Sequence, residues 1–320
     1  MNTNLRTDDA GGGAPLDAPT AAAAAEHPVR PMLTLVKREF WEHRSLWLWP
    51  LCAAGLMIVT ALFGRVNIDG SQIALTPQTL RSIFAVAVWA FGMILYVTMV
   101  IVLWFYATDC LYAERRDRSI LFWKSLPVSD AKTVLSKVLI AMVLVPLGVF
   151  ALAALTSLVV SAIFSIRAAT GSIPFSFWDT GTWLRVQGFT LATTIIFTLW
   201  YAPLTGYLML MSAWARRNVQ LWVLLPPLVL VLVEHFALGT HYVSRLLYYR
   251  LHGLWPPGFE HELGLLFNDD GPMPLRPGAH SPFTGDPFLG FANIDLWLGV
   301  AFGALCVLGA IRIRRYRDDS

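Results

Sequence analysis

The sequence predicts an all-α membrane protein with six transmembrane helices. The chain has 320 residues, of which 56% are apolar and only 14% charged, and its mean hydropathy is +0.57. Soluble domains usually carry about 25% charged residues, so this composition excludes an ordinary soluble domain. Long stretches contain no Asp, Glu, Lys or Arg, and several reach the length of about 20 residues that a membrane-crossing helix needs. The net charge of +3 gives no basic field for nucleic acid.

Four of these stretches qualify as spans outright, and two more qualify if one acid in each is tolerated. The fifth contains Glu234 near its end, and the sixth contains Asp295 near its start. The predicted spans are about 45–64, 82–108, 138–166, 186–215, 218–240 and 291–311. An even number of spans places both termini on the same side of the membrane.

The distribution of basic residues predicts which side that is. Of the 24 Lys and Arg, 17 lie before the first span, in the loop 109–137, in the turn after the fourth span, or in the tail 312–320. Cytoplasmic loops carry the excess of Lys and Arg in membrane proteins. We therefore expect both termini, the loop 109–137 and the basic tail 312–320 to be cytoplasmic.

The N-terminal region divides into two parts. Residues 1–30 are rich in Ala and Gly and predict a disordered cytoplasmic tail. Residues 31–44 predict an amphipathic helix, because Leu33, Val36 and Phe40 follow the i, i+3, i+7 spacing of one helix face. Such a helix would lie in the membrane interface before the first span; the alternative is that it simply extends the first span into water.

Two patterns inside the spans bear on how the helices pack. Proline at Pro146, Pro203 and the pair 226–227 predicts kinks, either passive or part of a moving gate. Gly299 and Gly303 form a GxxxG spacing, which allows close approach of another helix. That helix could belong to the same subunit or to a second copy.

The outer side carries a long irregular segment. Residues 241–290 are predicted to be extracytoplasmic, and seven Pro and seven Gly fall between Gly253 and Gly290. We expect an interfacial or partly re-entrant cap rather than one helix. Glu234 and His235 lie just before it and are a candidate outer gate, or else occupy an ordinary interface position.

Motifs for catalysis and cofactor binding are missing. None of the four Lys lies in a GxxxxGK[ST] phosphate loop, and the sequence has no HExxH or GxSxG motif. We therefore predict no catalytic, metal or cofactor site in this chain, and no enzymatic activity of its own.

The most informative stretch is the cytoplasmic loop 109–137. It begins with charged residues 114–118, continues with an apolar run at 120–123, and breaks at Leu126–Pro127. Ser129 or Asp130 can then cap a helix that runs through Lys137 into the third span. The loop could be an interfacial segment held to anionic lipid, or a docking element for a cytoplasmic partner.

At this loop the sequence resembles the ABC transporter type-2 permease family. The resemblance rests on Glu114–Arg115, Ser119, the apolar run, the stretch Ser125–Ser129 and the following Lys137. Six spans, cytoplasmic termini, an amphipathic helix before the first span and an outer element between the last two spans are also similar. The outer element here is longer than is usual in that family.

The resemblance implies a permease subunit of an exporter in the bacterial cytoplasmic (inner) membrane. Such a subunit pairs with a second permease copy, as a homodimer or a heterodimer. ATP and Mg are held by separate ATP-binding cassette subunits, and this chain holds no cofactor. The loop residues that would couple to the ATPase are Glu114, Arg115, Arg118, Ser119, Phe122, Trp123, Leu126 and Pro127. The N-terminal helix would contribute Lys37, Arg38, Phe40 and Trp41.

Other functions stay open from the sequence. An ion-coupled secondary transporter or channel would work without any ATPase and needs a coupling acid at the membrane midplane. A non-transporting assembly or sensory subunit would depend on the long outer segment. An intramembrane enzyme has the least support.

Overall fold

The computed structural model describes residues 29–64, 77–117, 129–171, 178–252 and 291–316. Within these ranges every regular element is a helix, which confirms the all-α class. Five helices are long and apolar enough to cross a membrane, and a sixth crossing results if one bent pair counts as a single span. The structure therefore confirms a helical architecture that suits a multi-pass membrane protein.

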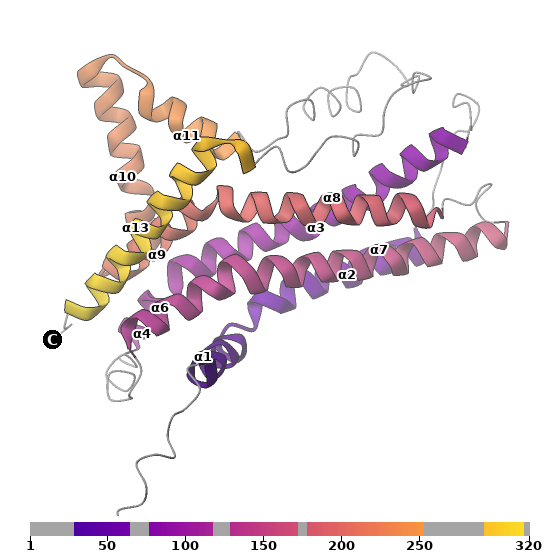
Figure 1. Ribbon diagram of the computed structural model, residues 1–320, viewed down its shortest axis with the longest axis horizontal. Coiled ribbons are helices and arrows are strands. Elements are labelled where there is room, and N and C mark those ends of the chain that lie inside the picture. Colours follow the sequence, from indigo (N-terminus) through magenta and orange to yellow (C-terminus); the bar gives the residue numbers. More distant parts are fainter. Residues whose placement is uncertain (1–28, 65–76, 118–128, 172–177, 253–290, 317–320) are drawn as a thin grey trace, which may run out of the picture.

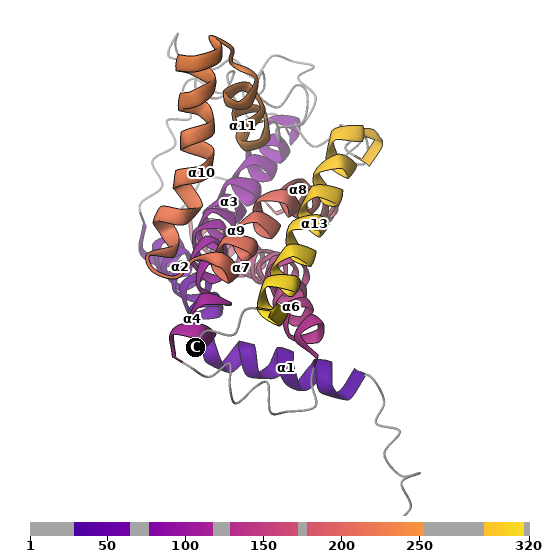
Figure 2. The ribbon, with the colours of Figure 1, turned by 90° about the vertical axis from the view of Figure 1, so that its left-hand side faces the viewer.

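The first four helices include one that lies across the others. Helix α1 (Val29–Glu42) is followed by the long helices α2 (Ser45–Phe63) and α3 (Pro77–Asp109) and by the short helix α4 (Tyr112–Arg116). Figure 1 shows α2 and α3 running along the molecule, whereas Figure 2 shows α1 lying crosswise at one end of it. A helix is thus present where the sequence predicts one before the first span.

The third span is part of one long helical rod. Helix α6 (Asp130–Leu139) passes through a π-helical turn, η1 (Ile140–Leu144), into α7 (Val145–Ala169). The side chain of Ser129 accepts a hydrogen bond from the amide of Lys132, which confirms the predicted cap. The wider turn directly precedes Pro146, which lacks an amide hydrogen and disturbs the regular α-helical pattern.

The predicted span 186–215 is two helices rather than one. Helix α8 (Thr180–Trp200) and helix α9 (Ala202–Trp214) meet at Tyr201 with a bend of 46°. Pro203 lies in the first turn of α9, where its missing amide hydrogen is tolerated, but the same ring cannot continue α8. A count of charge-free residues detects the length of this segment but not the break.

The fifth predicted span is helical within its limits, the sixth runs past its predicted end, and one more helix follows the fifth. Helix α10 (Val219–Val233) passes through the π-helical turn η2 (Glu234–Leu238) and is followed by α11 (Tyr242–His252). Helix α11 occupies the start of the predicted outer segment, and residues 253–290 lie outside the described part. Helix α13 (Ile294–Tyr316) continues into the predicted tail 312–320.

Two consecutive prolines lie within α10 without ending it. Pro227 has no amide hydrogen to donate to the carbonyl of Val223, four residues earlier. The hydroxyl of Tyr207 on α9 donates to that carbonyl oxygen at 2.8 Å. A neighbouring helix therefore satisfies the group that the proline leaves unpaired.

Helices α9 and α13 approach each other closely through glycine. A Cβ atom added at Gly206 would lie 2.5 Å from the carbonyl oxygen of Gly303, and one added at Gly303 would lie 2.6 Å from that of Ala202. A Cβ atom added at Gly299 would meet the guanidinium of Arg250 at 2.7 Å. The GxxxG spacing is therefore used within the chain, to pack α13 against α9 and α11.

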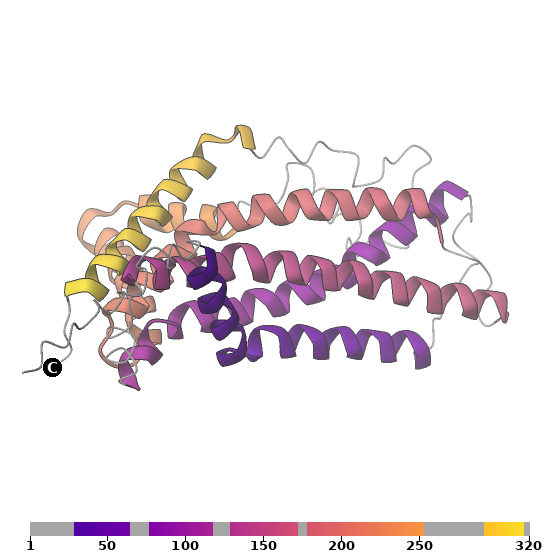
Figure 3. The same cartoon turned by 60° about the horizontal axis from the view of Figure 1, so that its bottom comes forward.

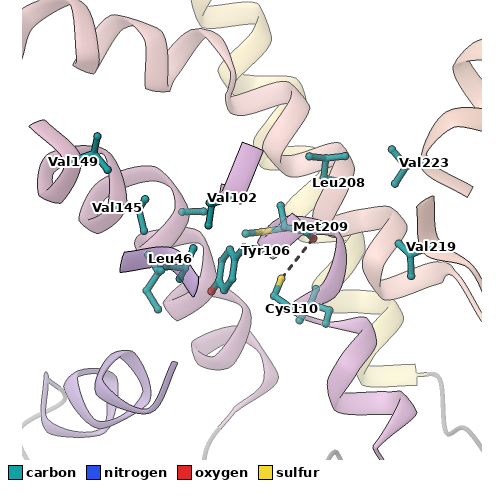
Figure 4. Packing of buried hydrophobic residues seen from close by; sticks show 14 of the residues in the cluster. Leu46, Val102, Tyr106, Cys110, Val145, Val149, Leu208, Met209, Val219 and Val223 are labelled. Atoms are coloured by element: carbon teal, nitrogen blue, oxygen red, sulfur yellow. Dashed lines mark hydrogen bonds between the residues drawn. The ribbon is translucent and has the colours of Figure 1, made fainter. Parts of the chain in front are cut away.

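The main apolar cluster joins α2, α3, α6, α7 and α9. Figure 4 shows Val102 and Tyr106 of α3 among Leu46, Val145 and Met209, all of which are buried. Figure 3 shows α2, α7 and α8 running alongside one another from this region. The cluster fixes the position of α3 just before α4, where most of the buried charge lies.

Candidate functional site

Six ionisable side chains from four helices meet at the end of the bundle where α1 lies. Figure 2 shows α1, α4, α6 and the last turns of α13 gathered there. Three of the side chains are cations and three are carboxylates. This charge cluster consists of Arg38, Glu39, Glu114, Asp130, Lys137 and Arg314.

Lys137 lies at the centre of the charge cluster. Its Nζ lies 2.5 Å from Oε1 of Glu39 on α1 and 3.1 Å from Oε1 of Glu114 on α4. The three side chains are 1%, 0% and 3% exposed, respectively. One ammonium group therefore joins the N-terminal helix to the two chain segments that flank residues 118–128.

Two arginines complete the charge cluster. Arg314 on α13 pairs with Oε2 of Glu114, and its Nε lies 3.0 Å from Oδ1 of Asp130. Arg38 Nη2 lies 2.8 Å from Oε1 of Glu39 and 2.9 Å from Oε1 of Glu114. Glu114 therefore contacts cations from three other helices, and α13 is fastened to the start of α6.

The electrostatics of the charge cluster depend on complete pairing. Moving a charge out of water is costly, and attraction between opposite charges offsets that cost only when the pairing is close. Its three positive and three negative groups balance. Removing one member would leave an unequal number of opposite charges in this largely buried cluster and would weaken the links between the four helices.

Aromatic and imidazole groups border the charge cluster at the α1–α2 turn. The hydroxyl of Tyr106 donates to Oε2 of Glu39 at 3.4 Å, and the ring of His43 meets that of Tyr106 edge to face at 5.0 Å. Burial lowers the pKa of His43 below its ordinary value, and Glu39 opposes this shift. His43 is therefore held mainly as the neutral imidazole at pH 7.

A second set of contacts fastens α4 to the end of α9. Arg115 Nη2 donates to the carbonyl oxygens of Ser212 at 2.6 Å and Ala215 at 2.8 Å. In return, the hydroxyl oxygen of Ser212 accepts from the amides of Leu111 and Tyr112. These amides follow the end of α3 and have no intrahelical partner, so the serine stabilises the break between α3 and α4.

The structure describes some of the predicted coupling residues and not others. Glu114 lies inside the charge cluster and Arg115 against α9, so these two side chains are internal contacts rather than a displayed surface. The remaining six lie outside the described residues: Arg118, Ser119, Phe122, Trp123, Leu126 and Pro127.

The predicted N-terminal residues divide in the same way. Arg38 joins the charge cluster, whereas Lys37, Phe40 and Trp41 are exposed. The ring of Phe40 lies 5.0 Å from that of Trp47 on α2. The surface of α1 away from the charge cluster thus carries aromatic side chains and a lysine, which suits the predicted interfacial position.

The sequence did not predict that four members of the charge cluster form buried ion pairs. Asp130 was a candidate helix cap, Lys137 was part of the motif that carries the resemblance, Arg314 was placed in a tail, and Glu39 was not singled out; none was expected in an ion pair. Glu39 follows Leu35 by four residues and therefore lies on the same face of α1. Both side chains are buried, so this shared position is a signal in the sequence that could have indicated burial of Glu39.

The predicted outer pair occupies the turn between α10 and α11. The carboxylate of Glu234 accepts from the amides of Tyr242, Val243 and Ser244, at 2.8 Å for Val243. An acid that binds the free amides of a helix N-terminus acts as a cap. The ring of His235 lies 5.3 Å from that of His241. The geometry gives Glu234 a structural role in this turn, and a gating role stays a prediction.

Neither a metal centre nor a known relative identifies the chain. In the part that the structure describes, no group of three or more His, Cys, Asp or Glu could hold a metal ion. Comparisons with protein-family models, curated proteins and solved structures gave no match. The chemistry of the charge cluster is therefore the starting point for function: its paired charges link helices.

Proposed function

We propose that the chain is the membrane subunit of an ATP-driven exporter, powered by a separate ATP-binding cassette subunit. The partner would act on the cytoplasmic loop 109–137 and would hold the ATP and Mg. Two membrane subunits, identical or different, would form the translocation path in the bacterial cytoplasmic membrane. The proposal keeps the side that the positive-inside distribution predicts, with both termini in the cytoplasm.

The observation that supports this function is the charge cluster. Glu114 and Asp130 stand on either side of the segment 118–128, and both bond to Arg314 at the end of α13. Lys137 joins the same assembly to α1. A partner that pushes on the loop would therefore move α1, α3, the α6–α7 rod and α13 together, rather than bend the loop alone.

Transport driven by a partner requires two membrane conformations that the partner biases. The charge cluster suits this requirement because it distributes one local displacement over several spans. An ion-coupled transporter is less well supported, since the acids of the described span helices lie near helix ends: Asp109, Glu114, Asp130, Glu234 and Asp295.

The direct test is assembly with an ATP-binding subunit encoded beside this chain. We expect the two proteins to co-purify from membranes, and the ATP hydrolysis rate of the partner to change when this chain is present in nanodiscs. Replacing the predicted docking aromatics, by Phe122→Asp together with Trp123→Asp, should abolish both effects. Arg216→Asp together with Arg217→Asp, on the exposed turn before α10, is the control with new acids elsewhere on the predicted cytoplasmic side.

Two outcomes would refute the assignment. Retained assembly with the Phe122→Asp and Trp123→Asp chain would exclude these residues as the docking site. Ion-gradient-driven flux through the purified chain alone, in liposomes without any ATP-binding subunit, would favour a secondary transporter or channel instead.

A further inference from the structure

A cavity of about 450 Å³ lies between α3, α7, α8 and α9, separate from the charge cluster. Its volume falls in the range of about 300–1,000 Å³ that is typical of small-molecule sites. Among the residues that the structure describes, none of the side chains that line it is charged. Apolar side chains of α3 and α7 form most of the wall, and polar side chains of α8 form one strip of it.

The cavity excludes charged molecules on energetic grounds. An ionised group transferred from water into an apolar environment without a counter-charge carries a large cost. The described part of the lining offers no Lys, Arg, Asp or Glu to offset that cost. A molecule that fits this wall is therefore uncharged and mainly apolar.

The threonines of the polar strip offer acceptors rather than donors. Thr190, Thr193, Thr194 and Thr198 on α8 each donate their hydroxyl hydrogen to the backbone carbonyl four residues earlier. A threonine hydroxyl has one hydrogen and two lone pairs, so each oxygen keeps accepting capacity only. Tyr96 on α3 lies 2.7 Å from Thr194, and because the Thr194 hydrogen is used, Tyr96 is the donor there.

The mouth of the cavity lies on an apolar surface. Val97, Val100 and Ile101 of α3 line the cavity and are 53–55% exposed. Since α3 is one of the helices that can cross a membrane, these side chains would face lipid. A ligand could therefore enter sideways from the bilayer.

From these observations we infer that the cavity binds an uncharged lipophilic molecule that carries a hydrogen-bond donor, such as a hydroxyl, directed at the threonine strip of α8. This inference names the class of molecule that the exporter would carry, and so it rests on the proposed function. Binding can be measured on the purified chain without any ATP-binding subunit. The binding inference and the proposed exporter function can therefore fail separately.

Photoaffinity labelling in nanodiscs tests the inference. The probe is hexadecanol that carries a diazirine, and the labelled peptides are mapped by mass spectrometry. We expect label on α3 and α8, and competition by unlabelled hexadecanol. The methyl ether of hexadecanol has no donor and should compete about fivefold less well, which is the worth of one hydrogen bond. Palmitate, which is charged, should compete no better than the ether.

Two matched variants separate the cavity from general membrane effects. A Cβ atom added at Gly92 meets nothing within 4 Å, and Gly92 lines the cavity, so Gly92→Leu should place a bulky side chain in it and weaken the label. Gly55 on α2 is equally open and does not line the cavity, so Gly55→Leu should leave labelling unchanged.

The threonine strip has its own pair of variants. Thr190→Val together with Thr198→Val removes two of the four acceptors and should reduce the preference for alcohol over ether while keeping the shape. Thr156 on α7 also donates its hydroxyl hydrogen to the carbonyl four residues earlier, but it lies outside the cavity. Thr156→Val should therefore leave the preference for alcohol over ether unchanged.

The outcomes are decisive in both directions. Equal competition by alcohol, ether and palmitate, or undiminished label in the Gly92→Leu chain, would overturn the inference. Competition by diacylglycerol as strong as that by hexadecanol would support the donor requirement and identify a membrane lipid as the source. Competition by hexadecanol alone would support it with a single-chain molecule as the ligand.

Discussion

Replacement of Lys137 by Met removes the central cation of the charge cluster while keeping an unbranched side chain. Lys137 is 1% exposed, and its ammonium group contacts two buried carboxylates, at 2.5 Å in Glu39 and 3.1 Å in Glu114. Removing one partner of a buried ion pair costs about 3–5 kcal/mol. Arg38 and Arg314 continue to pair with these carboxylates, so we expect the lower end, about 3 kcal/mol.

The measurement is reversible unfolding of the purified chain in mixed detergent micelles, followed by circular dichroism. Lys132→Met is the matched control, because Lys132 lies on the same helix but is exposed, and it should change stability by less than about 0.5 kcal/mol. Glu39→Gln combined with Lys137→Met should cost less than the sum of the two single changes, since the carboxylate left uncompensated is then neutral. Equal stability of Lys137→Met and Lys132→Met would refute the reasoning.

Three further predictions concern the surroundings of the charge cluster and the helix packing. Burial lowers the pKa of His43, so the stability that depends on its neutral form is present above the ordinary pKa of 6.5 and is lost as the pH falls below that value. In His43→Gln, unfolding curves recorded over a pH series should show a smaller loss of stability below pH 6.5. An unchanged dependence of stability on pH would exclude His43 as the cause. Tyr207→Phe leaves the carbonyl of Val223 without its donor and should destabilise the chain by about 1 kcal/mol in the same assay, whereas no loss would mean that the carbonyl finds another partner. Gly303→Leu forces side-chain atoms into the α9 backbone, so this chain should no longer give a monodisperse peak in size-exclusion chromatography. Gly55→Leu meets open space and should be tolerated. A folded Gly303→Leu chain would contradict the close approach of α9 and α13.

The helical class of the fold could be predicted because each membrane-crossing segment must itself be apolar and long enough, and this requirement can be read from the local sequence. Charge-free runs of sufficient length mark the helices, and Ser129 marks the start of α6 through a local hydrogen bond. Pro203 predicts the kink that the structure shows at Tyr201, but the 46° bend divides the predicted span 186–215 into two helices, and hydropathy is insensitive to that division. The partner of Gly303 was left open because glycine spacing permits close approach without specifying the other helix.

The charge cluster was largely beyond prediction for a related reason. Glu39 and Arg314 are separated by most of the chain, and each alone resembles an ordinary charged residue near a helix end. Only the tertiary arrangement brings Glu39 to Lys137 and Arg314 to Glu114, and shows that the charges are buried. The sequence did indicate the right region, since the basic residues are concentrated around 109–137.

Hydrogen–deuterium exchange on the assembled complex tests the proposed coupling most directly. The complex contains this chain and its ATP-binding subunit in nanodiscs, and exchange is compared before and after trapping the partner with ATP and vanadate. We predict that trapping changes amide exchange in α1 and in the last turns of α13, that Lys132→Met preserves this change, and that Lys137→Met confines it to the loop 109–137. Unchanged exchange in α1 and α13 on trapping, or a full response in the Lys137→Met complex, would contradict transmission through the charge cluster.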